Sequence, residues 1–151
     1  MALLWLIHMR HEGLTEKLKA GAVIFHDTGI LAAYAYGSRI AGTPRPDSDL
    51  DVGYFMTSCQ NRGPLSLYDE MRLADALSRL IGIEVDLRDL GEAPLELRGR
   101  AIEEGVRIFS ADDVARVALE RDLLARYHDY KDEFRRMHDL RLQRLAESGV
   151  R

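Results

Sequence analysis

The feature that most constrains the fold of this chain is a pair of short apolar segments joined by a loop that cannot be regular. Residues 30–36 read ILAAYAY, and this apolar run, bounded by glycines, predicts a buried β-strand. Residues 49–55 read DLDVGYF and begin by alternating acidic with apolar residues, which predicts a second strand. The loop between them, residues 37–48, contains two glycines and two prolines, which exclude regular structure across most of it.

The rest of the chain alternates helical and strand patterns around these two segments. Apolar residues recur at helical spacing before the first strand and after the second. The further elements that we expect are helices over residues 14–25, 65–82, 95–105 and 111–147, the last one long or broken, and strands over residues 83–90 and 106–109. This order predicts an α+β fold, an α/β sandwich in which a small mixed sheet is backed by helices and followed by a long C-terminal helix.

The length of 151 residues fits one domain with a single core. We expect this core over residues 1–110 and a helical extension over residues 111–151. Within the core, residues 1–11 are expected to be an extra strand or an unstructured lead, with Met9 as an alternative start. The apolar run in this lead has six residues and its basic residue follows the run, so we expect neither a membrane span nor a signal peptide.

Charge and cysteine content narrow the classes of function. The chain has 21 basic and 25 acidic residues and a net charge of -4, which argues against a grip on nucleic acid through its phosphates. We therefore expect no direct nucleic-acid binding, and any bound nucleotide should be small or held at a local site. The single cysteine, Cys59, excludes an internal disulfide and a cysteine-based zinc site. A cytoplasmic location is the expectation that follows.

Three aspartates are candidates for a metal site. Asp49 and Asp51 are two residues apart on an expected strand, so their side chains should project from one face about 7 Å apart. Carboxylates this close repel, and a divalent ion such as Mg²⁺ between them would relieve the repulsion. Asp86 lies on the next expected strand and would complete a cluster for two ions about 4 Å apart if the strands are neighbours. Asp89 competes for this role, although strand parity favours Asp86. The Asp-x-Asp pattern alone also fits a solvated turn.

Gly37 and Ser38 favour a phosphate-binding site over a solvated turn. A glycine lets the backbone approach a ligand closely, and successive amides with a serine hydroxyl can cradle phosphate oxygens. Arg39 either contacts a phosphate or caps the loop. A phosphate-binding loop that faces a metal site supplies what phosphoryl or nucleotidyl transfer needs, because the catalysis of these reactions is mostly positioning and charge neutralisation.

The stretch GSRIAGTPRPDSDLDV resembles the signature of the DNA polymerase beta nucleotidyltransferase superfamily, a Gly-Ser followed about ten residues later by Asp-x-Asp, with a third Asp on a later strand. The RxxG and PxSD details within it are typical of the small bacterial members, the minimal nucleotidyltransferases. The resemblance covers roughly residues 14–109, and LRGRAIEEGVRIF resembles the helix and last strand of those proteins.

The resemblance implies roles for the candidate residues. Gly37 and Ser38 would bind the β and γ phosphates of ATP, with Arg39 beside them. Asp49 and Asp51 would be ligands of two Mg²⁺ ions. Asp86 would be the third carboxylate, which helps to deprotonate or orient the attacking hydroxyl.

The resemblance also implies a biological role. A stand-alone minimal member is similar to the antitoxin of HEPN/minimal nucleotidyltransferase systems, whose HEPN partner is an RNA-cleaving toxin. The expectation is transfer of AMP from ATP to a tyrosine of that toxin within a hetero-oligomer. The alternatives are an antitoxin that acts by binding alone, and nucleotidylation of a small molecule such as an antibiotic.

The expected C-terminal helix carries a long apolar stripe interleaved with both signs of charge. This stripe either packs on its own domain or extends beyond what a small sheet can cover and marks a partner site. Its residues are Leu123, Leu124, Tyr127, Tyr130, Phe134, Met137, Leu140 and Leu145.

Overall fold

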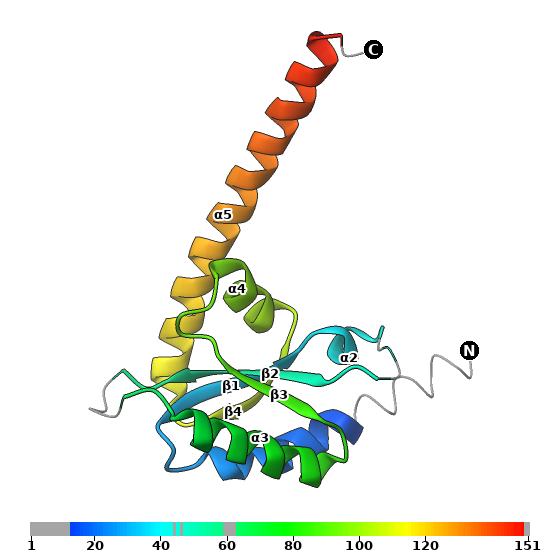
Figure 1. Cartoon of the computed structure of the whole chain (residues 1–151). Helices are drawn as coiled ribbons and strands as arrows, with labels where there is room; N and C mark the ends of the chain where they lie inside the picture. The colour runs from blue at the N-terminus through cyan, green and yellow to red at the C-terminus, as the bar shows by residue number, and fades with distance from the viewer. Residues whose placement is uncertain (1–12, 44, 46, 59–62, 150–151) are drawn as a thin grey trace.

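Four strands form one sheet between two layers of helices in the computed structural model of the chain, which describes residues 13–43, 45, 47–58 and 63–149 (Figure 1). Residues 13–21 are helical and continue into the short helix η1 (Ala22–Phe25). The elements that follow are β1 (Ile30–Tyr36), α2 (Ser38–Ala41), β2 (Leu50–Met56), α3 (Leu67–Ile81), β3 (Val85–Asp89), α4 (Leu95–Glu103), β4 (Val106–Ser110) and α5 (Asp113–Glu147). The expected α+β class is confirmed.

The sheet is mixed, with the strand order β3-β2-β1-β4. β1 pairs antiparallel with both β2 and β4, whereas β2 and β3 are parallel and connected through α3. All seven residues of β1 are buried because this strand is central and covered on both faces. That position explains why its sequence is a continuous apolar run rather than an alternating one.

One face of the sheet is covered by α3, η1 and residues 13–21 (Figure 1). α3 begins after Ser66, whose hydroxyl accepts a hydrogen bond from the Asp69 backbone N–H, and ends at Gly82 in a left-handed conformation, as expected. It buries Leu73, Leu77 and Ile81 against this face.

The opposite face is covered by α4 and the first part of α5. Tyr34 and Phe55 of the sheet pack there with Leu123 of α5. Gly99 of α4 has no side chain, and the ring of Tyr127 occupies the space that a Cβ at this position would need. This close approach joins α4 to α5.

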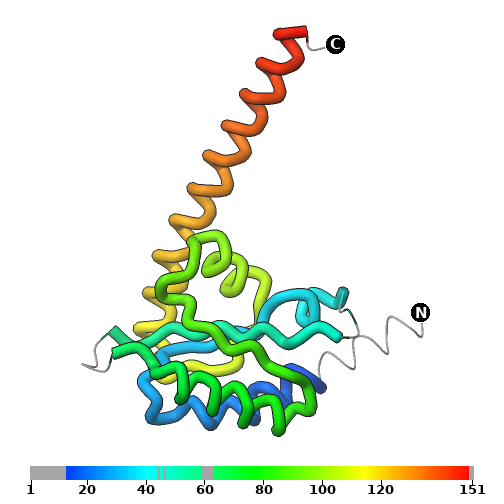
Figure 2. Tube along the Cα trace, viewed as in Figure 1, coloured from blue at the N-terminus to red at the C-terminus, as the bar shows by residue number. Residues whose placement is uncertain are grey.

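α5 is one unbroken helix of 35 residues, about 52 Å long at the usual rise per residue. Asp112 caps its start, because the carboxylate accepts hydrogen bonds from the backbone N–H groups of Val114 and Ala115. Leu123 and Tyr127 are buried, but every residue from 132 to 149 is exposed. Figure 2 shows this second half of α5 running away from the rest of the chain.

Some expectations fall on residues that the structure does not describe. The lead over residues 1–11, the alternative start at Met9 and the loop around Cys59 lie outside the described residues. Within the described part of the chain, no helix combines the length and the apolar character needed to cross a membrane.

Candidate functional site

Tyr36, Asp51 and Asp86 form a row across the neighbouring strands β1, β2 and β3, and we call these three residues the acidic row. Tyr36 is paired with Asp51 in the antiparallel register of β1 and β2, and Asp51 is paired with Asp86 in the parallel register of β2 and β3. The alternation of side chains puts the three on the face covered by α4, because Leu50 and Val85 point into the core on the α3 face. β2 and β3 are thus neighbours. This was the condition under which Asp86 could complete a cluster with Asp49 and Asp51.

Asp89 has a different environment from Asp86. It is paired with Tyr54, and its carboxylate accepts a hydrogen bond of 2.7 Å from the backbone N–H of Gly91. This contact holds the turn after β3. Asp86 instead lies directly beside Asp51, so the geometry favours Asp86 as the third acid.

Asp49 lies just before β2, which begins at Leu50 rather than at residue 49 as expected, and its side chain is exposed. The loop before it is held in place by Arg39, whose Nε donates a hydrogen bond to the carbonyl of Ser48. This contact matches the cap that was one of the two roles considered for Arg39. Its role as a phosphate ligand stays a prediction.

Gly37 has a backbone conformation that favours glycine, with φ 83° and ψ -167°. A Cβ at this position would collide with a carboxylate oxygen of Asp51. The loop after it contains a single helical turn, α2, in which the backbone N–H groups of Ile40 and Ala41 donate to the Gly37 carbonyl. The loop is therefore more regular at its start than its glycines and prolines suggest. Gly37 lies directly beside Asp51, and Ser38 follows it as the first residue of α2.

The carboxylates of Asp51 and Asp86 lie side by side in the acidic row and repel each other. The pKa of Asp51 is raised, first by burial, then by Asp86 and least by Asp49, while the guanidinium of Arg88 opposes the shift. Arg88 lies two residues from Asp86 on the same face, and its Nη2 is 3.0 Å from Oδ2 of Asp86. Burial and the charge of Asp51 likewise raise the pKa of Tyr36. A cation placed here would relieve this repulsion.

The residues present partly fit a magnesium site. Asp51 and Asp86 supply oxygen ligands from directly paired positions, which suits a hard ion. However, the described residues contain no group of three or more His, Cys, Asp or Glu side chains arranged to hold a metal ion. Asp49 is exposed at the edge of the row, and Asp86 already forms an ion pair with Arg88. The three-carboxylate centre therefore stays a prediction.

Sequence reasoning missed Tyr36 and assigned no role to Arg88. The only signal in the sequence was strand parity, because Arg88 is two residues after Asp86. Tyr36 is the last residue of its strand, and only the register with β2 places it beside Asp51.

The paired Asp51 and Asp86 and the turn at Gly37 lie in a segment of the chain that matches a known protein family. Residues 17–114 match the family model described as Polymerase beta, Nucleotidyltransferase, and the chain belongs to this family. None of the curated protein sequences compared with the chain matches it.

Solved structures show the same fold at low sequence identity. A toxin–antitoxin complex with AMP-PNP contains a chain that is 19% identical, with a TM-score of 0.60 over 85% of this chain and 98% of that one. A mutant toxin–antitoxin complex of MntA gives 17% identity and a TM-score of 0.62 over 85% and 98%. A complex of a tri-AMPylated Shewanella oneidensis HEPN toxin with its MNT antitoxin gives 15% identity and a TM-score of 0.53 over 90% and 98%.

Proposed function

We propose that this chain is an antitoxin that transfers AMP from ATP, with Mg²⁺, to a tyrosine hydroxyl of a HEPN-type toxin. The observation that carries the proposal is the direct pairing of Asp51 with Asp86 beside Gly37. Membership of the nucleotidyltransferase family supports transfer chemistry. The complex of an MNT antitoxin with a tri-AMPylated HEPN toxin, which has the same fold, supports the acceptor and the hetero-oligomer.

The proposed roles are those that the family resemblance implies, and the pairing of Asp51 with Asp86 beside Gly37 supports them. The backbone at Gly37 and the hydroxyl of Ser38 hold the triphosphate, with a glycine required because a larger residue would displace Asp51. Asp49, Asp51 and Asp86 hold Mg²⁺, which when bound neutralises the charge that develops on the phosphates. Asp86 also orients or deprotonates the acceptor hydroxyl. The tyrosine oxygen bonds to the α-phosphorus, the bond from this phosphorus to the leaving oxygen breaks, and pyrophosphate leaves.

A mass-spectrometric assay tests this proposal. The chain is incubated with ATP, Mg²⁺ and a purified HEPN-type toxin, and we expect the toxin to gain mass in steps of one AMP. Asp51→Asn and Asp86→Asn should each lower the transfer rate by about a hundredfold or more, because metal neutralisation is worth several kcal/mol.

Asp89→Asn is the matched control for this assay, since Asp89 lies on the same strand but contacts Gly91. It should transfer AMP at a rate close to that of the wild type. Toxin that stays unmodified after incubation with the wild-type chain would exclude the proposed reaction. Label that appears on an antibiotic instead of the toxin would favour nucleotidylation of a small molecule.

The second candidate function is an antitoxin that neutralises its toxin by binding alone. The exposed second half of α5 favours it, because this segment offers apolar side chains that the domain does not cover. An Asp49→Asn, Asp51→Asn double variant separates the two candidates. Growth rescue by this variant at normal expression would establish binding as sufficient, whereas loss of rescue supports catalysis.

A further inference from the structure

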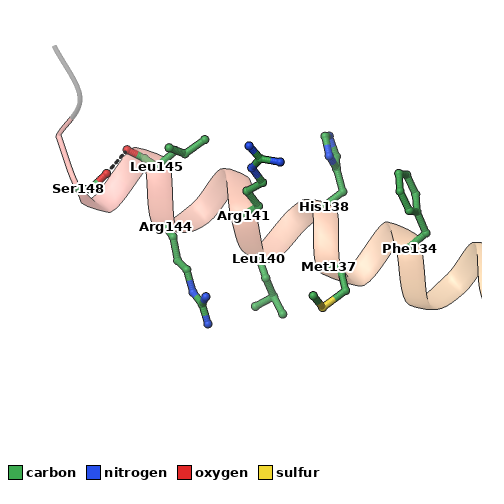
Figure 3. Close-up of a pocket in the computed structure, with 8 residues that line it drawn as sticks. All are labelled: Phe134, Met137, His138, Leu140, Arg141, Arg144, Leu145 and Ser148. Carbon is green, nitrogen blue, oxygen red and sulfur yellow. Dashed lines mark hydrogen bonds between the residues drawn. The ribbon is translucent and has the colours of Figure 1, made fainter.

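The second half of α5 carries a surface that no other element of the described chain covers. We call this surface the distal surface; it is lined by Phe134, Met137, His138, Leu140, Arg141, Arg144, Leu145 and Ser148 (Figure 3). Seven of these residues belong to α5, and Ser148 is the residue that caps its C-terminal end. The distal surface is therefore formed by the end of one helix, where every residue from 132 to 149 is exposed.

The distal surface continues the face by which α5 packs on its own domain. Leu123 and Tyr127 are buried, and Tyr130, Phe134 and Met137 follow them at alternating spacings of three and four residues. This spacing keeps all five side chains on one face of the helix. Phe134 is 63% exposed and Met137 is 64% exposed. An apolar stripe that runs from a buried contact into solvent is the pattern of a helix that packs on a second surface.

The charges of the distal surface indicate what that second surface contains. Arg141 and Arg144 line it together with His138, and no acidic residue does. Neither arginine has an ion-pair partner in the described part of the chain, whereas Arg135, outside this surface, lies 3.5 Å from Asp132. A second copy placed face to face would bring four arginines together, which disfavours self-association through this surface. Carboxylates around an apolar patch would complement it.

From the charges of the distal surface, and from its continuity with the buried face of α5, we infer that it binds a different protein. The matching surface of that partner would be an apolar patch bordered by carboxylates. The identity of the partner rests on the proposed function, under which it is the HEPN toxin. The docking surface and the acidic row are then separate parts of the molecule. One part captures the toxin and the other modifies it.

Binding of the purified HEPN toxin to the full-length chain tests this inference. Two double variants change the distal surface, Phe134→Ser with Met137→Ser and Arg141→Glu with Arg144→Glu. Each should raise the Kd for the toxin by at least about tenfold, which is the cost of losing about 1.4 kcal/mol at an interface. Higher salt should weaken binding of the wild type, because the arginines contribute charge pairs at the interface.

Matched controls lie on α3. Leu67 and Met71 are 72% and 64% exposed, so Leu67→Ser with Met71→Ser removes equally exposed apolar side chains from another helix. Arg72→Glu with Arg79→Glu reverses the same number of charges there. Both control variants should bind the toxin with a Kd within about twofold of wild type, since exposed substitutions outside an interface cost little.

The kinetics of AMP transfer separate a failure of docking from a failure of the proposed chemistry. The distal variants should raise KM for the toxin and leave kcat unchanged, because the acidic row is intact. Loss of toxin binding in these variants, without AMP transfer by the wild type, would support docking and reject the transfer. Wild-type KM in the distal variants would reject docking and retain the transfer.

Two further outcomes overturn the docking inference. One is a toxin that does not bind the wild-type chain. The other is a wild-type dimer in light scattering that becomes a monomer in the Phe134→Ser, Met137→Ser variant while toxin binding stays unchanged. In that case the distal surface would pair with a second copy.

Discussion

Asp51 lies at the centre of the acidic row, between Tyr36 on one side and Asp86 on the other. Its pKa is raised, so the folded chain holds the Asp51 proton more tightly than the unfolded chain does. Ionisation of Asp51 therefore destabilises the folded state. This cost is absent below the pKa of the unfolded chain and is complete once the pH exceeds the raised pKa.

The Asp51→Asn variant is therefore expected to be more stable than the wild type at neutral pH in the absence of metal. The gain should disappear at about pH 3, where carboxylates are protonated in both states. Thermal unfolding at the two pH values measures this. Addition of Mg²⁺ should raise the Tm of the wild type but not of the variant, because a ligand stabilises the state that binds it.

Asp75→Asn is the control for this pH experiment. Asp75 forms an exposed ion pair of 2.7 Å with Arg79 on α3, so its loss should lower stability slightly or not at all. A variant at Asp51 that is less stable than the wild type at neutral pH would contradict the repulsion described here.

At the scale of single elements, α3 shows what helical periodicity can and cannot predict. Its end followed from Gly82, because glycine favours the left-handed conformation found there, whereas its start was expected at residue 65 and lies at Leu67, after the capping Ser66. The buried face of α3 could not be predicted in this way. Leu67, Met71 and Ala74 precede Leu77 and Ile81 at helical spacing in the sequence, but Leu67 and Met71 are exposed, and Leu73 is buried instead. Both stripes share Leu77 and Ile81, and periodicity alone does not indicate which part of a helix the sheet will cover.

The contact between α4 and α5 gives a prediction at this scale. Gly99→Ala would improve helix propensity by about 1 kcal/mol at an exposed site. Here the new Cβ would collide with the ring of Tyr127, so we expect a net loss of about 1–3 kcal/mol from overpacking. Urea unfolding measures the change in the free energy of unfolding.

A double-mutant cycle controls for effects on α4 itself. In a Tyr127→Ala background the Gly99→Ala substitution should cost less, because the Cγ and Cδ atoms that the new Cβ would meet have been removed. Equal costs in both backgrounds would show that the collision is not the cause.

The geometry of the candidate site was predictable in part. Strand alternation fixes the face on which each side chain lies, and it therefore favoured Asp86 over Asp89 as the neighbour of Asp51. The direct pairing of Asp51 with Asp86, and the position of Tyr36 beside them, depend on strand register, which is set by packing across the whole sheet. The ion pair between Arg88 and Asp86 was missed because strand parity predicts that the two side chains lie on one face of the sheet, but it does not predict that they contact each other.

For the whole molecule, the structure divides α5 into a part that stabilises the domain and a part that does not. Leu123 and Tyr127 are buried in the first part, whereas all residues from 132 to 149 are exposed. The Nζ of Lys131 lies 2.9 Å from a carboxylate oxygen of Glu103 and marks the last contact with α4 that the described residues show.

Truncation tests this division. A chain that ends at Glu133 should keep its Tm within a few degrees of wild type, because exposed residues contribute little. A chain that ends at Asp122 loses two buried side chains, each worth about 2–5 kcal/mol, and should unfold or melt far lower. Circular dichroism during thermal unfolding measures both. A large drop in Tm for the longer fragment would mean that residues beyond 133 stabilise the domain.

The length of α5 also restricts the geometry of any protein that uses both ends of this molecule. Residues 129–147 extend for about 28 Å at the usual helical rise. Under the proposed function and the docking inferred above, a toxin bound at the end of α5 and modified at the sheet would have to extend over that distance. Its target tyrosine is therefore expected on a protruding arm or a remote edge, away from the patch that is held.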